Sequence, residues 1–280
     1  MVLSTVAFAV MVVLVKLGRT DLGYSAMQLI LWRSLAGIPL VALLTGRKLR
    51  VERRDLLLLR CLFGFGAMYS FFSAARHLSV GELTVVVKLQ PIVVALLAPL
   101  VLGRGERSDR RGIVALGLGM AGTVALLWPD LQASAWTGHL TGVGWALMAA
   151  GCSAVTHTML RALGPTEDPR VVVFWFQIAV GLGAAVGVLA DSGLPLPTAP
   201  WAWGVVLGIG AAAAIGQLLM TRAYQLERAA RVAAASYTAP LFGFLADAVV
   251  FDRLPGTHAA VGAVLVVAGG ALVVLRPPSR

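Results

Sequence analysis

Apolar stretches long enough to cross a bilayer recur along the whole of this 280-residue chain, separated by short polar loops. About 20 residues of helix span a hydrocarbon core that is ~30 Å thick. Hydrophobic residues make up 59% of the chain and charged residues only 13%, whereas soluble domains carry roughly 25% charged residues. The sequence therefore predicts an all-α integral membrane protein with ten transmembrane helices. The expected spans are residues 2–17, 26–44, 56–75, 83–102, 112–128, 141–160, 171–190, 201–221, 232–251 and 259–275.

Basic residues are distributed unevenly between alternate loops. Fifteen of the 23 Lys and Arg residues lie in one set of loops and in the C-terminal tail, and only three lie in the other set. Because cytoplasmic loops collect Lys and Arg, both termini are expected in the cytoplasm. The same bias explains the net charge of +10 without a nucleic-acid partner. A bacterial inner membrane is the expected location, with the membrane lipids as partners.

The two halves of the chain, residues 1–135 and 136–280, carry similar landmarks in the same order at offsets of 148 to 150. Because each half has five expected spans, the two copies would have opposite orientations in the membrane. Inverted repeats of this kind are typical of transporters that bind substrate near the midplane. The matched landmarks are Ala75-Arg76-His77-Leu78 with Ala223-Tyr224-Gln225-Leu226, Leu89-Gln90-Pro91 with Thr238-Ala239-Pro240, and Gly103-Arg104 with Asp252-Arg253.

Three short motifs resemble a known family. They are Leu31-Trp32-Arg33-Ser34, the segment 74–84 (Ala-Ala-Arg-His-Leu-Ser-Val-Gly-Glu-Leu-Thr), and Leu89-Gln90-Pro91 followed by Leu102-Gly103-Arg104-Gly105-Glu106. With ten spans and short loops, they resemble the drug/metabolite transporter superfamily, specifically its EamA-type members, over essentially the whole chain. The pair Lys16 and Arg33 is similar to the subgroup that resembles S-adenosylmethionine-uptake transporters. The second half departs from the family pattern, with Asp252-Arg253 in place of Leu-Gly-Glu and Gln177 opposite Arg33.

Ionisable residues deep in a membrane are functional hypotheses by default. Arg33 follows Ser25 by eight residues, ~12 Å of helix, which places it near the midplane. Lys88 lies ~9 Å inside its span by the same rise. Lys16 is close to a helix end, where it could either reach the interface or join the site. Arg60, five residues from Asp55, is expected to reach the interface or form a structural ion pair.

Asp247 is the best buried acid of the second half, about 7.5 Å below the outer surface. It could form an ion pair with Lys88 or Arg33, or line a cavity, and a gating pair would do both. The deep cations still outnumber this acid. Because Arg binds carboxylates bidentately and Lys acts as a point charge, the excess favours a substrate that carries carboxylate or phosphate.

Two prolines, Pro91 and Pro240, interrupt apolar spans at corresponding places. Each proline frees a backbone carbonyl one turn earlier, which is tolerated where the carbonyl lines a cavity or meets a side chain. Polar residues surround both prolines, so the substrate site is expected here, with a packing kink as the alternative. These neighbours are Lys88, Gln90, Ser236, Tyr237 and Thr238.

Other polar or aromatic residues within the spans are weaker candidates for the site. Tyr69, Gln177 and Trp175 could line the same cavity, or could form interhelical contacts. His157 could relay protons, since its unperturbed pKa is ~6.5, or be a structural histidine. The chain shows no catalytic constellation, cofactor motif or metal-binding spacing, so neither an enzyme nor a metal or cofactor is expected.

Together these features predict a secondary active transporter that moves a small anionic or zwitterionic metabolite by alternating access. An exporter of amino acids or hydrophobic drug-like compounds is the main alternative. A non-transporting structural or sensory membrane protein is a further alternative, and it would have a filled bundle without a central cavity. The oligomeric state is left open between monomer and homodimer.

Overall fold

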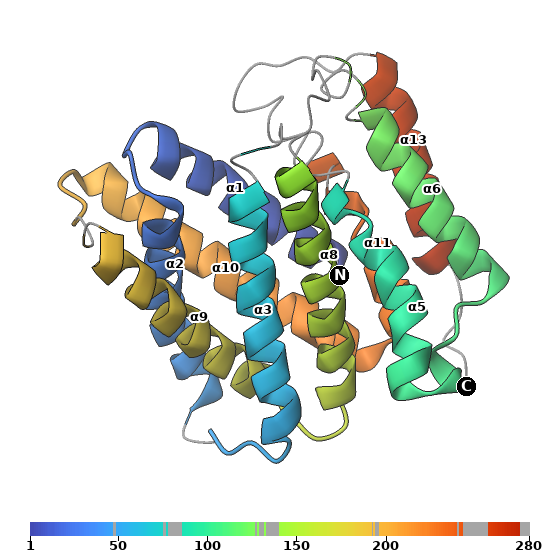
Figure 1. Cartoon of the computed structure of the whole chain (residues 1–280), viewed down its shortest axis with the longest axis horizontal. Helices are drawn as coiled ribbons and strands as arrows, with labels where there is room; N and C mark the ends of the chain where they lie inside the picture. The colour runs from blue at the N-terminus through green and yellow to red at the C-terminus, as the bar shows by residue number, and fades with distance from the viewer. Residues whose placement is uncertain are drawn as a thin grey trace.

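The computed structural model describes residues 1–46, 49–74, 77, 86–126, 128, 132, 140–191, 193, 196–239, 241–242 and 257–274, and the described part is a helical bundle without strands (Figure 1). Its helices are α1 (Val2–Thr20), α2 (Ala26–Thr45), α3 (Arg54–Ala74), α5 (Gln90–Leu102), the 3-10 turn η1 (Arg104–Glu106), α6 (Arg110–Leu126), α8 (Leu140–Leu163), α9 (Pro169–Asp191), α10 (Pro200–Leu226), α11 (Ala229–Ala235) and α13 (Thr257–Val274).

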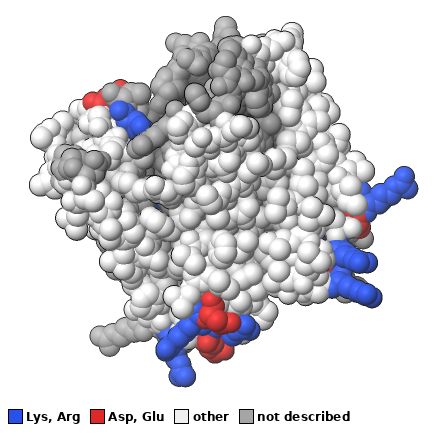
Figure 2. Space-filling model, viewed as in Figure 1, with Lys and Arg blue, Asp and Glu red and all other residues white. Residues whose placement is uncertain are grey.

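Five of these helices, α1, α2, α8, α9 and α10, are long and apolar enough to cross a membrane. They confirm five of the spans predicted from the sequence, while parts of the spans predicted at 83–102 and 232–251 lie outside the described residues. On α9, the exposed residues Leu182, Val186 and Leu189 share one face of the helix. Figure 2 shows charged side chains mainly along the lower and lower-right edges, and a smaller charged group at the upper left. A broad uncharged surface lies between these two regions. The protein is a multi-pass membrane protein.

The local sequence explains where several helices begin and end. Ser25 caps α2, since its Oγ accepts from the Gln28 amide at 3.3 Å and Gln28 Oε1 accepts from the Ser25 amide at 2.8 Å. Such a capping box satisfies amides that lack partners inside the helix. At the other end, Gly46 has a φ of +64°, a conformation that glycine adopts without strain. Pro200 stands in the first turn of α10, where a missing amide hydrogen is harmless.

Helices that are distant in sequence lie side by side in pairs. The most extensive contacts join α3 with α8, α6 with α13, α1 with α10 and α2 with α9, and α5 contacts α11. In Figure 1 the α6–α13 pair stands at the right edge of the bundle, and α3 and α8 lie near its centre. Each of these pairs takes one helix from residues 1–126 and the other from residues 140–274. The two halves of the chain are therefore packed against each other along much of their length.

Glycines allow these helices to approach closely. A Cβ placed on Gly210 of α10 would lie 3.0 Å from the backbone carbonyl carbon of Ala36 and the backbone nitrogen of Gly37 on α2. A Cβ on Gly122 of α6 would lie 2.9 Å from the carbonyl oxygen of Gly262 on α13. Small residues at helix contacts are the usual means of close packing between membrane helices.

Charged residues join the helix ends at the lower and lower-right side of Figure 1. We call this side the basic end and define it by residues 49–53, 103–109, 164–168 and 227–228. Buried Glu106 accepts from Arg161 Nε through Oε1 at 2.8 Å and from the Ala229 amide through Oε2 at 2.9 Å. Arg161 also donates to the Gln225 carbonyl at 2.8 Å. One carboxylate therefore connects η1 with the end of α8 and the start of α11.

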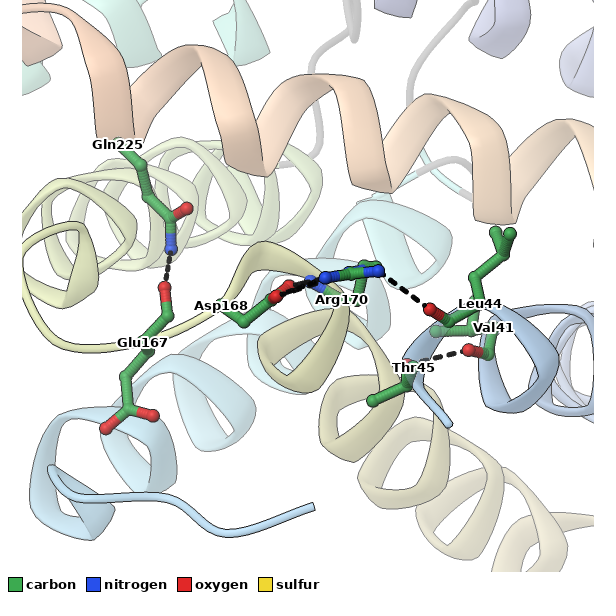
Figure 3. Close-up of polar contacts among 7 residues, drawn as sticks. All are labelled: Val41, Leu44, Thr45, Glu167, Asp168, Arg170 and Gln225. Atoms are coloured by element: carbon green, nitrogen blue, oxygen red, sulfur yellow. Dashed lines mark hydrogen bonds and ion pairs between the residues drawn. The ribbon is translucent and has the colours of Figure 1, made fainter. Parts of the chain in front are cut away.

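A second group of contacts holds the loop between α8 and α9 at the same end. Glu167 accepts from the backbone amides of Glu52 and Arg53 at 2.8 and 2.7 Å. Figure 3 shows Gln225 Nε2 donating to the Glu167 carbonyl at 3.1 Å, and Arg170 lying between Asp168 and the Leu44 carbonyl. The ion pair with Arg170 lowers the pKa of Asp168, which therefore stays ionised.

Replacing Glu106 with glutamine is expected to lower the free energy of unfolding by about 1–3 kcal/mol, because Arg161 would lose its charged partner in a mostly buried setting. Unfolding of the purified protein in a denaturing detergent measures the change. Asp55→Asn is the matched control, since Asp55 pairs with Arg53 at the exposed surface and surface pairs contribute little. Equal effects of the two substitutions would contradict the structural role of Glu106.

Candidate functional site

A cavity of about 320 Å³ lies among α1, α2, α3, α8, α9 and α10. Its wall is largely apolar and includes Phe8, Met11, Met68, Phe71, Phe176 and Met220. Its polar lining residues are Arg33, Arg60, Ser153, Thr156, His157 and Gln217. A mostly apolar cavity with a few convergent polar groups is typical of a small-molecule site.

Arg33 extends from α2 into this cavity and is only 5% exposed. Its Nη1 donates to the Met68 sulfur at 3.5 Å, and its Nε has no hydrogen-bond partner among the described residues. A thioether is a weak acceptor, so it compensates poorly for the water that a guanidinium loses on burial. The sequence prediction placed Arg33 deep in the membrane, and the structure brings it to the cavity.

Arg60 is the second cation in the cavity and is only 1% exposed. Its guanidinium carbon lies 3.7 Å from the centre of the Phe176 ring, and Nη2 donates to Gln217 Oε1 at 3.2 Å. Within the described ranges, Nε and Nη1 have no partner. The expectation that Arg60 reaches the interface or forms a structural ion pair is wrong. Its side chain is buried at the cavity, and the nearby acid, Asp55, pairs with Arg53 at 3.0 Å.

The cavity-lining residues of α3 follow helical spacing. Arg60, Gly64, Met68 and Phe71 all line the cavity and recur on α3 at intervals of four, four and three residues, which is one face of a helix. Ser153 and Thr156, which were not predicted as site residues, lie beside His157 on α8 and line the cavity. Helices that are apolar on every side give no other signal of which face is turned toward a cavity.

The electrostatic balance of the cavity is positive. Arg33 and Arg60 both line it, and no Asp or Glu belongs to its wall among the described residues. Thr156 is also buried there, with a hydroxyl that has no partner in the described part of the chain. Asp247, the acid predicted to lie near the deep cations, is outside the described residues.

His157 lines the cavity beside these cations. Its Nδ1 lies 2.8 Å from Nε2 of Gln90 on α5, and its ring stacks on that of Tyr224 with centroids 4.7 Å apart. With Nδ1 accepting from the Gln90 amide, the proton of a neutral ring would sit on Nε2. Gln90, predicted as a substrate ligand, thus touches the site through His157.

Lys88 and Tyr237, also predicted substrate ligands, form hydrogen bonds between two turns and do not belong to the cavity wall. Lys88 Nζ donates to the Ser236 carbonyl at 3.1 Å, and the Tyr237 hydroxyl donates to the Lys88 carbonyl at 3.0 Å. Pro91 is in the first turn of α5, directly after a turn at residues 88–89, and α11 ends before a turn at residues 236–237. Two interrupted helices therefore meet at their interruptions, while Pro240 lies outside the described residues.

Four further predicted ligands do not belong to the cavity wall, namely Trp175, Tyr69, Gln177 and Thr238. Trp175 donates to the Leu49 carbonyl at 3.1 Å near the basic end. Tyr69 is 44% exposed and packs edge-on against Trp145. Gln177 is fully buried against Gly37 of α2. Thr238 lies 3.1 Å from Thr5 through the two hydroxyl oxygens, and Lys16 is on α1, with its side chain outside the described part.

Comparison with known proteins finds relatives that match nearly the whole chain. The EamA-like transporter family matches residues 1–128 and 140–275. The pseudopaline exporter CntI of Pseudomonas aeruginosa is 28% identical over 277 residues, covering 98% of this chain and 92% of the relative. Solute carrier family 35 member G1 of Homo sapiens is 25% identical, covering 80% of this chain and 63% of the relative.

A solved crystal structure has the same fold, with a TM-score of 0.78, 20% sequence identity and coverage of 96% of this chain and 95% of that chain. The family match extends over nearly the whole sequence and includes the helices that carry Arg33, Arg60 and His157. The chain is a membrane transporter and belongs to the EamA-like transporter family of the drug/metabolite transporter superfamily.

Proposed function

We propose that this transporter moves a small anionic or zwitterionic metabolite by secondary active, alternating-access transport, with Arg33 and Arg60 as its substrate ligands. The observation that carries the proposal is the pair of buried guanidinium groups in one cavity, both with N–H groups that lack partners among the described residues. Burying an unpaired charge costs several kcal/mol. A substrate anion would offset that cost in each transport cycle, and a guanidinium suits carboxylate or phosphate.

Alternating access needs two units that move against each other, and we assign these units to residues 1–135 and 136–280 as inverted five-helix repeats with cytoplasmic termini. The helix pairing supports this division. α8 begins 138 residues after α1 begins, and α10 begins 146 residues after α3 begins, so α8 and α10 are the counterparts of α1 and α3 in the order of the spans. If each helix is exchanged for its counterpart in the other half, the α1–α10 contact becomes the α8–α3 contact. The same exchange maps the α2–α9 pair and the α6–α13 pair onto themselves.

The contact between the two interrupted helices is the proposed pivot. Ser236 and Tyr237 follow Lys88 by 148 and 149 residues, which is the offset between the two repeats. The two hydrogen bonds therefore join corresponding positions of the two halves. Discontinuous helices near the midplane are where transporters of this type bind substrate or bend. His157 on the cavity wall and Asp247 are the proposed groups for coupling or gating.

Lys88→Met is expected to leave substrate affinity within about twofold but to slow transport roughly tenfold, because it removes a charge-assisted hydrogen bond between the repeats and no ligand from the cavity. Equilibrium binding and proteoliposome uptake on the same preparation separate the two quantities. Tyr237→Phe removes the reciprocal bond and should act in the same direction. Loss of binding in Lys88→Met would instead place Lys88 in the substrate site.

Uptake into proteoliposomes tests the proposal with a panel of labelled anionic, zwitterionic and cationic metabolites under imposed proton and solute gradients. Accumulation of anions or zwitterions by the parent protein, above protein-free vesicles, is the expected result. Transport of cations alone would refute it.

The second candidate, an exporter of amino acids or hydrophobic compounds, is favoured by the largely apolar cavity wall and by the exporter named among the relatives. The proposed location is a bacterial inner membrane, and the proposed oligomeric state is a monomer or homodimer.

A further inference from the structure

We infer that the substrate is an amphipathic organic anion, with one acidic group held between Arg33 and Arg60 and an apolar body packed against the phenylalanine and methionine wall. The inference rests on the proposed function and narrows its substrate class. It excludes hydrophilic dianions, and it excludes zwitterions whose ammonium group is next to the carboxylate. Each part of the inference follows from the positions of the two guanidiniums and from the composition of the wall.

The two guanidinium groups reach neighbouring turns of α3. A Cβ on Gly64 would clash with Arg60 Nη1 and would lie 2.6 Å from Cε2 of Phe176, so the Arg60 side chain extends one turn along its own helix to lie over residue 64. Arg33 approaches the same helix from α2 at Met68. Residues 64 and 68 are about 6 Å apart along the helix axis. One acidic group between these positions is within reach of both side chains.

The N–H groups that lack partners match a single carboxylate. Arg33 Nε and Arg60 Nε and Nη1 have no acceptor among the described residues. An ionised carboxylate has about four lone-pair sites and no donor, so it could accept from both arginines at once. Charge-assisted hydrogen bonds of this kind are roughly twice as strong as neutral ones.

The charge of the cavity disfavours an ammonium group beside that carboxylate. In an α-amino acid the ammonium is attached to the adjacent carbon, so it would lie a few ångströms from two guanidiniums. Like charges at such distances repel strongly where water is excluded. The described part of the wall offers no Asp or Glu to compensate.

The rest of the wall suits an apolar body and disfavours a second acid. Three phenyl rings, from Phe8, Phe71 and Phe176, and three thioethers, from Met11, Met68 and Met220, come from four helices. A second carboxylate placed against them would lose its water without gaining a partner. Methionine side chains are flexible, so they can adapt to bodies of different shape.

A matched set of probes tests this inference on the purified full-length protein in lipid nanodiscs. Labelled 4-phenylbutyrate carries one carboxylate and one ring, and its displacement by unlabelled compounds gives relative affinities. The inference predicts that 4-phenylbutyramide, phenylalanine, succinate and acetate each compete at least about tenfold more weakly than 4-phenylbutyrate. No saturable binding of 4-phenylbutyrate would overturn the inference.

Two glycines on α3 provide a matched pair of variants. Gly64→Ala should weaken 4-phenylbutyrate binding at least about tenfold, because the added methyl would displace the Arg60 guanidinium. Gly66→Ala should leave it unchanged, since its Cβ would meet only Cys152 Sγ, at 3.6 Å. Arg60→Lys keeps the charge without the planar fork and should also weaken binding, which covers a failure of Gly64→Ala to fold. Equal affinities in parent, Gly64→Ala and Arg60→Lys would refute the placement of the acidic group.

The outcomes separate this inference from the proposed function. Suppose that succinate or phenylalanine bound as tightly as 4-phenylbutyrate, and that Arg60→Gln abolished binding of that compound and of 4-phenylbutyrate. The inference would then fail, while the proposal of an anion or zwitterion transporter would be retained. If 4-phenylbutyramide bound as tightly as 4-phenylbutyrate, both would fail, because the carboxylate would then contribute nothing.

Discussion

Replacing Arg60 with glutamine is expected to lower anion transport roughly ten- to a hundredfold, because the substrate would lose charge-assisted hydrogen bonds in a site sheltered from water. The same substitution should leave the unfolding temperature unchanged or raise it. Among the described residues, Arg60 has one hydrogen bond and one ring contact to compensate for its buried charge. Removing a poorly paired buried charge relieves a desolvation cost. Loss of function with retained stability distinguishes a substrate ligand from a structural arginine.

Counterflow of a labelled anion in proteoliposomes and thermal unfolding of the same sample measure the two effects. Arg33→Gln should behave as Arg60→Gln does, since both guanidiniums line the same cavity. Arg53→Gln is the control, because Arg53 is half exposed, pairs with Asp55 and lies just outside α3. A cooperative loss of folding in Arg60→Gln, or transport at the parental rate, would contradict the assignment of Arg60 as a ligand.

Gly210→Ala is expected to have the largest effect on stability, lowering the free energy of unfolding by about 1–3 kcal/mol or more. The added methyl would lie 3.0 Å from backbone atoms of Ala36 and Gly37 and would also clash with the Ala36 side chain. Backbone atoms in the middle of a helix cannot rotate away, so α2 and α10 would have to separate. The cavity lies between these helices and α3, so transport should fall as well.

The matched control for Gly210→Ala is Gly204→Ala on the same helix, where a Cβ would meet no atom within 4 Å. Alanine has the higher helix propensity, so this control should be neutral or stabilising by up to about 1 kcal/mol. Unfolding in a denaturing detergent compares the two variants under one condition. Similar stabilities for Gly210→Ala and Gly204→Ala would show that α2 and α10 are not packed at this distance.

The sequence allowed the helices to be placed, because a membrane span needs an uninterrupted apolar stretch and because caps such as Ser25 and Pro200 are visible in the sequence. The depth of Arg33 also followed from a residue count along one helix. The direction of each side chain did not follow, because a helix that is apolar on every side has no amphipathic face to indicate the interior.

Arg60 and Lys88 illustrate this limit. Arg60 is close enough to a helix end to be interpreted as an interfacial residue, yet the space over Gly64 lets it turn inward along its own helix. Lys88 is deep enough to be predicted as a ligand, yet its ammonium group donates to the Ser236 carbonyl exposed by the turn at residues 236–237. Both outcomes depend on contacts between helices that are far apart in the sequence.

Crystals soaked in sodium bromide test the central claim most directly, because anomalous scattering locates bromide and the ion competes for the same donors as a substrate carboxylate. The account predicts a bromide peak in the cavity within hydrogen-bond distance of both Arg33 and Arg60, and loss of that peak in Arg60→Gln. Bromide bound only at the basic end, or a carboxylate of this chain in contact with the two guanidiniums, would contradict the claim that these arginines are free to bind a substrate anion.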